Sequence, residues 1–212
     1  MTPNEKRPRT LPPEARRKQI IDAVLTVVAE HGVRGASTAR LAKVADVSQG
    51  TLYLYFKNRQ EMFAAAIDEI FTQMEGLFQD CYETSPIDCL RKEAQHHTEL
   101  MKTGHSFVNA WVEFIAAGTQ EGLRAEVART QQRAFDMIKA YVEQGKAQGA
   151  IRSDCDSDRF VWQWQTVMWG ENMSVLMDLP AFMDEGHSTA LSELLLRSVD
   201  ARVLGGSDRK PK

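Results

Sequence analysis

The stretch that decides the fold is STARLAKVADVSQGTLYLYF, residues 37–56. Ser37 or Thr38 can cap a short helix that runs to about Ala45, because a hydroxyl oxygen accepts from the free N–H groups of a first turn. Ser48 can cap a second short helix over 49–56 in the same way. Two short helices joined by a tight turn are typical of a helix-turn-helix.

The second short helix carries polar and aromatic side chains where a DNA reader needs them. Leu41, Val47, Leu52 and Phe56 supply a core, so the other side chains face outward. The outward set lies at the front and outer face of a helix that enters a major groove. We expect Gln49 to pair with an adenine edge, and the other expected members are Gly50, Thr51, Tyr53, Leu54 and Tyr55.

The flanking sequence extends this unit on both sides. A first helix is predicted over 13–31, with Gly32 as a left-handed stop. Asn58 and Glu61 form a capping-box-like start for a fourth helix of about 24 residues, roughly 36 Å long, which we interpret as the connector to a second domain. Residues 1–12 form a basic, proline-containing arm that we predict to be flexible.

Charge is divided unevenly along the chain. Residues 1–60 contain eleven Lys and Arg against five Asp and Glu, a formal charge of +6, so the remainder carries −9. A basic first part favours a polyanion as its partner.

The rest of the chain also predicts helices, so the fold class is all-α with about nine helices. We expect a helix-turn-helix domain over 13–60, an effector-binding and dimerisation domain over 61–204, and a flexible tail over 205–212. Strict two-residue alternation, the mark of strands, is absent. The later helices are predicted at 86–103, 105–117, 121–147, 157–178 and 187–203.

Several classes of protein are disfavoured by the sequence. No uncharged run approaches the ~18 residues that span a bilayer, so we expect a cytoplasmic protein without a membrane partner. Cys81, Cys89 and Cys155 have no metal-ligand spacing and are expected to be reduced thiols. Serine-hydrolase, phosphate-loop and zinc-protease patterns are missing, so we expect no enzyme, no catalytic residues, no cofactor and no metal.

Residues 47–63, VSQGTLYLYFKNRQEMF, resemble the signature of the TetR family of transcriptional regulators, and the likeness runs from Arg17 to Ile67. Asp46 departs from the family pattern, which usually has Gly in the turn, but Asp tolerates a left-handed conformation. Residues 149–156 resemble a turn found in many members, including the BetI-type C-terminal class. The resemblance and the outward face together give the predicted DNA-binding set: Arg17, Ser37, Thr38, Ser48, Gln49, Gly50, Thr51, Tyr53, Leu54, Tyr55, Lys57 and Arg59.

The predicted helix 157–178 is apolar nearly all round, so it must be covered on two sides. One side can pack inside its own bundle and the other against a second copy of the chain. TetR-like proteins pair in this way, through a four-helix interface. The predicted dimer residues are Val161, Trp169, Leu176, Leu191, Leu195 and Val199.

Aromatic and methionine side chains in the second domain suggest an apolar effector cavity, although such a stripe is more often plain core. The candidate effector residues are Phe107, Trp111, Phe114, Phe135, Trp164, Met168 and Asn172. His97, Glu171, Glu113, Asn109 and His105 are candidates for polar contacts. Glu93, His96 and His97 also raise a metal or catalytic possibility, with surface or capping histidines as the favoured interpretation.

The leading hypothesis is a homodimeric repressor that a small, largely apolar effector releases from a palindromic operator in double-stranded DNA. One alternative is an all-helical ligand-binding protein or enzyme whose first bundle only dimerises. Another is an architectural DNA binder without a ligand.

Overall fold

The structure is a computed structural model that describes residues 11–79, 85–103, 105–119 and 122–204. Its described residues form helices, with one isolated bridge between Ile151 and Asp200 and no named strand. The all-α prediction is therefore confirmed. Most of the predicted arm, the predicted tail and Cys81 lie outside the described residues. The helices are α1 (Pro13–Gly35), α2 (Thr38–Val44), α3 (Gln49–Tyr55), α4 (Arg59–Gln79), α5 (Pro86–Thr103), α6 (His105–Ala117), α7 (Arg124–Ala147), α8 (Ser157–Leu176), α9 (Ala181–Asp184), α10 (His187–Val199) and α11 (Ala201–Leu204).

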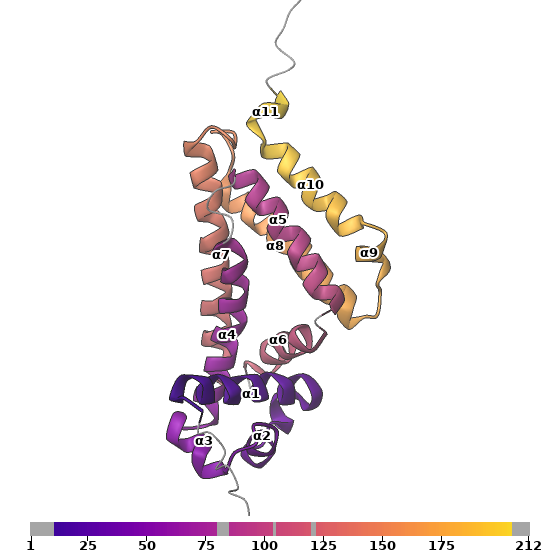
Figure 1. Cartoon of the computed structure of the whole chain (residues 1–212). Coiled ribbons are helices and arrows are strands. Elements are labelled where there is room, and N and C mark those ends of the chain that lie inside the picture. Colours follow the sequence, from indigo (N-terminus) through magenta and orange to yellow (C-terminus); the bar gives the residue numbers. More distant parts are fainter. Residues whose placement is uncertain (1–10, 80–84, 104, 120–121, 205–212) are drawn as a thin grey trace, which may run out of the picture.

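Helices α1 to α3 form a small unit at one end of the molecule (Figure 1). Leu41, Leu52 and Phe56 are buried in its core, as the sequence predicts. Gly32 has φ +69°, a left-handed conformation that interrupts α1 one residue after the predicted end. Asp46 has φ +50°, so the turn between α2 and α3 does adopt the conformation for which the family usually has Gly.

Helix α4 leaves the small unit and runs along α7 into the larger body (Figure 1). Its first turns belong to the core of the small unit, where Phe63 meets Phe114 of α6 edge to face at 5.9 Å. Further along, Arg133 of α7 pairs with Asp68 and lies over the ring of Phe71, 4.0 Å from its centroid. The predicted connector is thus held by an aromatic contact in its first turns and by an ion pair and a cation–π contact near its middle.

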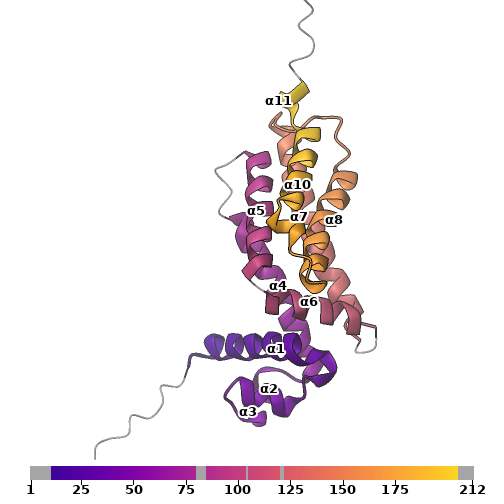
Figure 2. The same cartoon turned by 90° about the vertical axis from the view of Figure 1, so that its right-hand side faces the viewer.

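The larger body is built from α5, α7, α8 and α10, which Figure 2 shows side by side. Its core includes Phe160, whose ring stacks on the indole of Trp164, and Val161 and Leu196. Helix α6 lies between the two units and packs extensively along α1. Because α6 contributes to the core of the small unit and contacts α5, α7 and α8, the two units meet across a packed helix as well as through the connector.

The short helices α9 and α11 were not predicted. They explain why the described residues contain eleven helices rather than the predicted nine or so. The predicted helix 187–203 is divided at Asp200, whose backbone is extended with ψ 118° and pairs with Ile151. This pairing joins residues about 50 positions apart, so helical periodicity gives no sign of it. Helix α9 follows Pro180, at which the sequence predicts only a break.

Candidate functional site

The outer face of α3 presents large side chains to solvent. Leu54 is 83% exposed and Tyr53 is 50% exposed, whereas the neighbouring Leu52 is fully buried. Gln49 and Gly50 are also exposed, at the first turn. The exposed face of α3 thus presents an amide, an aromatic ring and an aliphatic side chain to solvent.

Serine caps set the start of both short helices. Ser48 Oγ accepts from the Thr51 backbone N–H at 3.0 Å, and the two hydroxyls are hydrogen-bonded at 2.8 Å. Ser37 Oγ accepts from the Arg40 backbone N–H at 3.3 Å. Each cap satisfies one of the N–H groups that a first turn leaves without a helical partner. The caps therefore fix the direction in which α3 projects.

A second capping arrangement begins α4. Asn58 Oδ1 accepts from the Glu61 backbone N–H at 2.8 Å, and Glu61 Oε2 accepts from the Lys57 backbone N–H at 2.6 Å. The capping pattern read from the sequence is confirmed. Arg59 lies in this first turn with its guanidinium 5.0 Å from the centroid of the Phe63 ring. A cation at a helix N-terminus beside backbone N–H groups makes a favourable place for phosphate.

Basic side chains flank α3 on the other side as well. The guanidinium of Arg17 lies 5.0 Å from the centroid of the Phe56 ring, and Arg17 is exposed. Lys57 is exposed beyond the C-terminus of α3. The α3 face and these cations together form what we call the basic reading face: Arg17, Gln49, Thr51, Tyr53, Leu54, Lys57 and Arg59.

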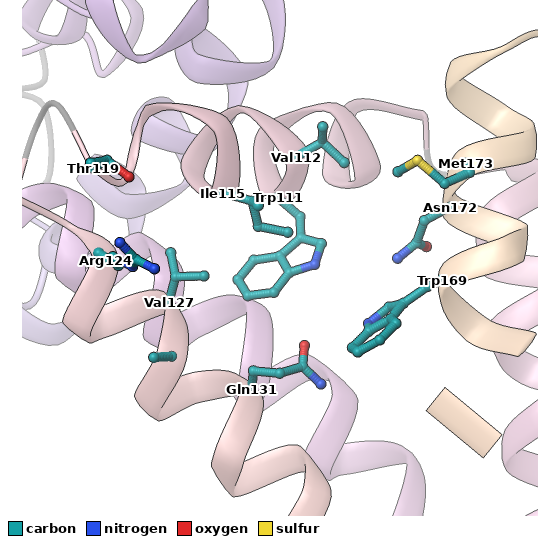
Figure 3. Close-up of a pocket in the computed structure, with 11 residues that line it drawn as sticks. Trp111, Val112, Ile115, Thr119, Arg124, Val127, Gln131, Trp169, Asn172 and Met173 are labelled. Carbon is teal, nitrogen blue, oxygen red and sulfur yellow. The ribbon is translucent and has the colours of Figure 1, made fainter. Parts of the chain in front are cut away.

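A cavity of about 580 Å³ lies in the larger body between α6, α7 and α8. The indoles of Trp111 and Trp169 project into it from α6 and α8, with Gln131 of α7 beside them (Figure 3). Ile115 and Met173 are partly exposed where they line it. The volume lies in the range of small-molecule sites, and the lining is mostly apolar. We call this space the outer chamber.

A second, smaller cavity of about 40 Å³ adjoins the outer chamber, and we call it the inner chamber. Trp111, Gln131, Trp169 and Asn172 line both. The inner chamber also touches polar side chains, namely Glu93, His97, Thr130 and Gln165.

Buried hydrogen bonds hold the polar side chains around the inner chamber. Trp164 Nε1 donates to Glu93 Oε2 at 2.9 Å, and the His97 ring Nδ1 lies 2.6 Å from Glu171 Oε2. Thr98 Oγ1 donates to the other oxygen of Glu171 at 2.6 Å. All five side chains are buried. Buried polar groups that are paired in this way are held in one geometry.

The two carboxyl groups of this cluster have opposite pKa shifts. Burial raises the pKa of Glu93, because an ionised carboxylate is disfavoured without solvent, although His97 and the Trp164 N–H oppose the shift. Burial acts in the same direction on Glu171, but the hydrogen bonds from His97 and Thr98 outweigh it and lower the pKa of that carboxyl. Glu171 is thus the ionised partner of the cluster.

Family comparison accounts for both units of the chain. Residues 20–66 match the model for bacterial regulatory proteins of the tetR family, and residues 90–189 match the model for a tetracyclin repressor-like C-terminal domain. The chain belongs to the TetR family. Its C-terminal match is not to a BetI-type model, so the resemblance of residues 149–156 to that class is not confirmed.

Among TetR-family relatives, the fatty acid metabolism regulator protein of Bacillus subtilis is 30% identical over 125 residues, which are 58% of this chain and 61% of that protein. The chain thus spans less than two thirds of this relative's length in the match. The repressor KstR2 of Mycolicibacterium smegmatis is 24% identical, over 74% of this chain and 80% of its own. The structure of FadR from Bacillus subtilis in complex with stearoyl-CoA superposes with a TM-score of 0.65 at 24% identity, covering 84% of this chain and 97% of FadR.

The structure brings four of the predicted effector residues to the cavity: Phe107, Trp111, Met168 and Asn172 line one chamber or both. It corrects the placement of three others. Phe114 lies in the core of the small unit, and Phe135 packs against Trp162. Trp164 is fully buried, with its indole N–H hydrogen-bonded to Glu93. Side chains one helical turn apart on α6 face different neighbours, because α6 is covered on both sides.

The polar candidates also separate. His97 is buried beside the inner chamber rather than being a surface histidine, whereas His96 is exposed. Glu113 turns away from the cavity and accepts from the backbone N–H of Val33. Asn109 does not line either chamber, and the side chain of His105 lies outside the described set. In the described ranges, no group of three acidic, histidine or cysteine side chains could hold a metal ion.

Some of the predicted dimer residues on α8 and α10 are buried in the chain's own core, and others are exposed. Val161 is fully buried and Val199 nearly so within the chain's own core, so neither has surface to offer a partner. Leu195 is half-buried against the same core, and Trp169 lines the cavity. Leu176 and Leu191 are exposed as predicted. Several apolar side chains outside the predicted dimer set are also exposed: Trp162, Met177, Leu179, Leu194 and Val203.

The described helices include none long and apolar enough to cross a membrane. Cys89 is buried and Cys155 half-buried.

Proposed function

We propose that this TetR-family chain is a homodimeric repressor that binds a palindromic operator and is released from it by a small, largely apolar effector. The observation that carries the proposal is the basic reading face, on which a capped helix presents Gln49, Tyr53 and the 83% exposed Leu54 between cations. An exposed leucine in a basic surface suits a thymine methyl group in a phosphate-lined groove.

Each side chain of the basic reading face has a distinct role in this proposal. Gln49 pairs with an adenine edge, and Leu54 meets a thymine methyl. Thr51 and Tyr53 donate to phosphates, and Arg59 binds a phosphate at the N-terminus of α4. Thr38 assists because its hydroxyl donates to Gln49 Oε1 at 3.3 Å, which orients that side-chain amide. Tyr55 is half-buried against the core and contributes less.

Dimerisation follows from an apolar surface on α8 and α10. Leu176 of α8 and Leu191 of α10 are exposed, at 39% and 43%. Trp162 is 55% exposed, and Leu194 of α10 is 64% exposed. Helices with such faces pair readily in a four-helix interface, and two copies would present two reading helices to the two halves of a palindrome.

The cavity is the proposed effector site, and α6 is the element that connects it to the DNA-binding unit. Trp111 and Ile115 of α6 line the outer chamber, while Phe114 packs in the core of the small unit. Glu113 accepts from the backbone N–H of Val33 at 3.4 Å, beside the left-handed Gly32 at the break in α1. A ligand that shifts α6 therefore acts on α1 directly, and it needs only a difference in affinity between the two states.

The relatives support regulation by a small molecule. The stearoyl-CoA complex places a ligand with a long apolar part in FadR, and KstR2 is a repressor by name. For this chain, the chamber volume of about 580 Å³ supports an effector of small-molecule size.

The test of DNA binding is a mobility-shift assay with DNA from the region upstream of the chain's own coding sequence. We expect Gln49→Ala with Tyr53→Ala to lower affinity roughly 100-fold or more, because good base and phosphate contacts contribute about 1–3 kcal/mol each. Gln163→Ala, an exposed glutamine on α8, is the matched control and should bind as the wild type does. Affinity should also fall steeply with salt. Unchanged affinity in the double variant would overturn the contact assignment.

A further inference from the structure

The two chambers differ in what they can hold. The outer chamber, at about 580 Å³, accepts the body of a small molecule between two indoles. The inner chamber, at about 40 Å³, has room for only a few waters or one small chemical group, since a single water needs about 10–15 Å³ on this measure. Trp111 and Trp169 line both, so the two chambers adjoin, and the ligand proposed below has one end in each.

The inner chamber contains an unused hydrogen-bond donor. Gln165 is 3% exposed and lines this chamber, and its side-chain Nε2 has no hydrogen-bond partner among the described residues. A buried N–H group without an acceptor is unfavourable, and native structures contain few. The donor therefore points to an acceptor atom that a ligand would bring.

A hydrogen-bond acceptor lies at the same chamber. Glu93 lines it, and the indole N–H of Trp164 holds one of its carboxyl oxygens in place. His97, also at this chamber, is held by Glu171. These side chains lie on α5 and α8, two packed helices, so the polar end of the cavity is formed before any ligand arrives.

We propose that the effector has an apolar body in the outer chamber and, at its buried end, a small group that both accepts from Gln165 and donates to Glu93, such as a hydroxyl or a carboxamide. A hydrocarbon terminus is excluded from the inner chamber, because it would remove water from Glu93 and Gln165 and replace none of their hydrogen bonds. This inference rests on the proposed effector function and deepens it by naming the chemistry of the ligand's buried end.

Three matched probes test the proposal: biphenyl, 4-phenylphenol and biphenyl-4-carboxamide. Their bodies are the same, and only the end group differs. Binding to the full chain is followed by quenching of tryptophan fluorescence and by the shift in melting temperature. Transfer from water alone favours biphenyl, the most apolar of the three. We expect the reverse order, with the phenol or the amide binding on the order of tenfold or more tightly than biphenyl.

The residue assignment is tested by Gln165→Met, which retains the length of the side chain and removes the donor. We expect the preference for the phenol over biphenyl to fall about fivefold in this variant, because the phenol can still donate to Glu93 but has lost the donor at position 165. Gln163→Met, the same change at an exposed position of α8, should keep the wild-type preference. Circular dichroism verifies that each variant is helical. The order of the three probe affinities is measured on the wild-type chain, so it does not depend on the folding of any variant.

The outcomes separate this inference from the proposed function. Biphenyl binding as tightly as 4-phenylphenol, a preference that Gln165→Met leaves unchanged, or no binding of any probe would each overturn the donor and acceptor end group. The operator assay of the preceding section does not depend on these probes. Loss of the probe preference with intact DNA binding contradicts only this inference, whereas absence of DNA binding contradicts the proposed function.

Discussion

The basic reading face and the inner chamber use polar side chains in opposite ways. Beside the reading face, Ser48 and Asn58 cap the helices that carry it, and its polar side chains are exposed or half-buried. Around the inner chamber, carboxyl groups are buried and each hydrogen bond joins side chains more than 70 residues apart. An exposed polar group costs little, whereas a buried one must be paired. Substitutions around the inner chamber should therefore affect stability most, whereas substitutions on the reading face should affect DNA affinity most.

The largest expected effect is the loss of Glu171. We predict that Glu171→Ala destabilises the chain by about 3 kcal/mol, because it leaves His97 buried without its carboxylate partner, whereas Thr98 can still donate to the Ala94 carbonyl oxygen. Chemical denaturation measures the change. The matched control is Glu185→Ala, which breaks an exposed pair with His187 at 3.3 Å and should cost less than about 0.5 kcal/mol. Equal effects in the two variants would contradict the comparison.

A cap on the reading face should have a smaller effect on stability. Ser48→Ala removes the acceptor for the Thr51 backbone N–H, and we expect a loss of about 1 kcal/mol. Because the cap also fixes the direction of α3, operator affinity should fall in the same variant. Ser48→Asp, which retains a capping oxygen, should restore most of the melting temperature. Failure of Asp to do so would show that capping is not the cause.

Glu93 gives a prediction about pH. Burial raises its pKa in the folded chain, so its contribution to stability is present below the unfolded pKa of about 4.5 and is lost as pH rises through the folded value. Glu93→Gln does not titrate and can still accept from Trp164. The melting temperature of this variant relative to wild type should therefore increase as pH rises from 4.5. A difference that is constant with pH would contradict the effect of burial.

The smallest expected effect on stability is at Leu54. With 83% of its side chain exposed, Leu54→Ala should change the free energy of unfolding by less than about 0.5 kcal/mol. Operator affinity should nevertheless fall, because a thymine contact is lost. Leu52→Ala, two residues away in the buried core, is the contrasting variant and should cost about 2–5 kcal/mol. A destabilised Leu54→Ala variant would place that side chain in the fold rather than in recognition.

Much of the first unit could be predicted because its signals are local. Ser48 lies three residues from the N–H that it caps, Asp46 forms its turn with its neighbours, and Asn58 and Glu61 are one helical turn apart. Such interactions leave a fixed spacing in the sequence. The exposed face of α3 then follows from which side chains its core requires.

Residue spacing and local motifs were enough to predict the all-helical fold, the helix-turn-helix with its caps and outward face, and the family. Tertiary packing was needed to show that Trp111 lines a cavity whereas Phe114, in the same core cluster, does not, that Trp162 rather than Val161 is exposed on α8, and that Glu93 and Gln165 share one chamber. The physical reason is distance along the chain. Helical periodicity indicates that a residue is buried, but the packing of α5, α6, α7 and α8 decides what it is buried against.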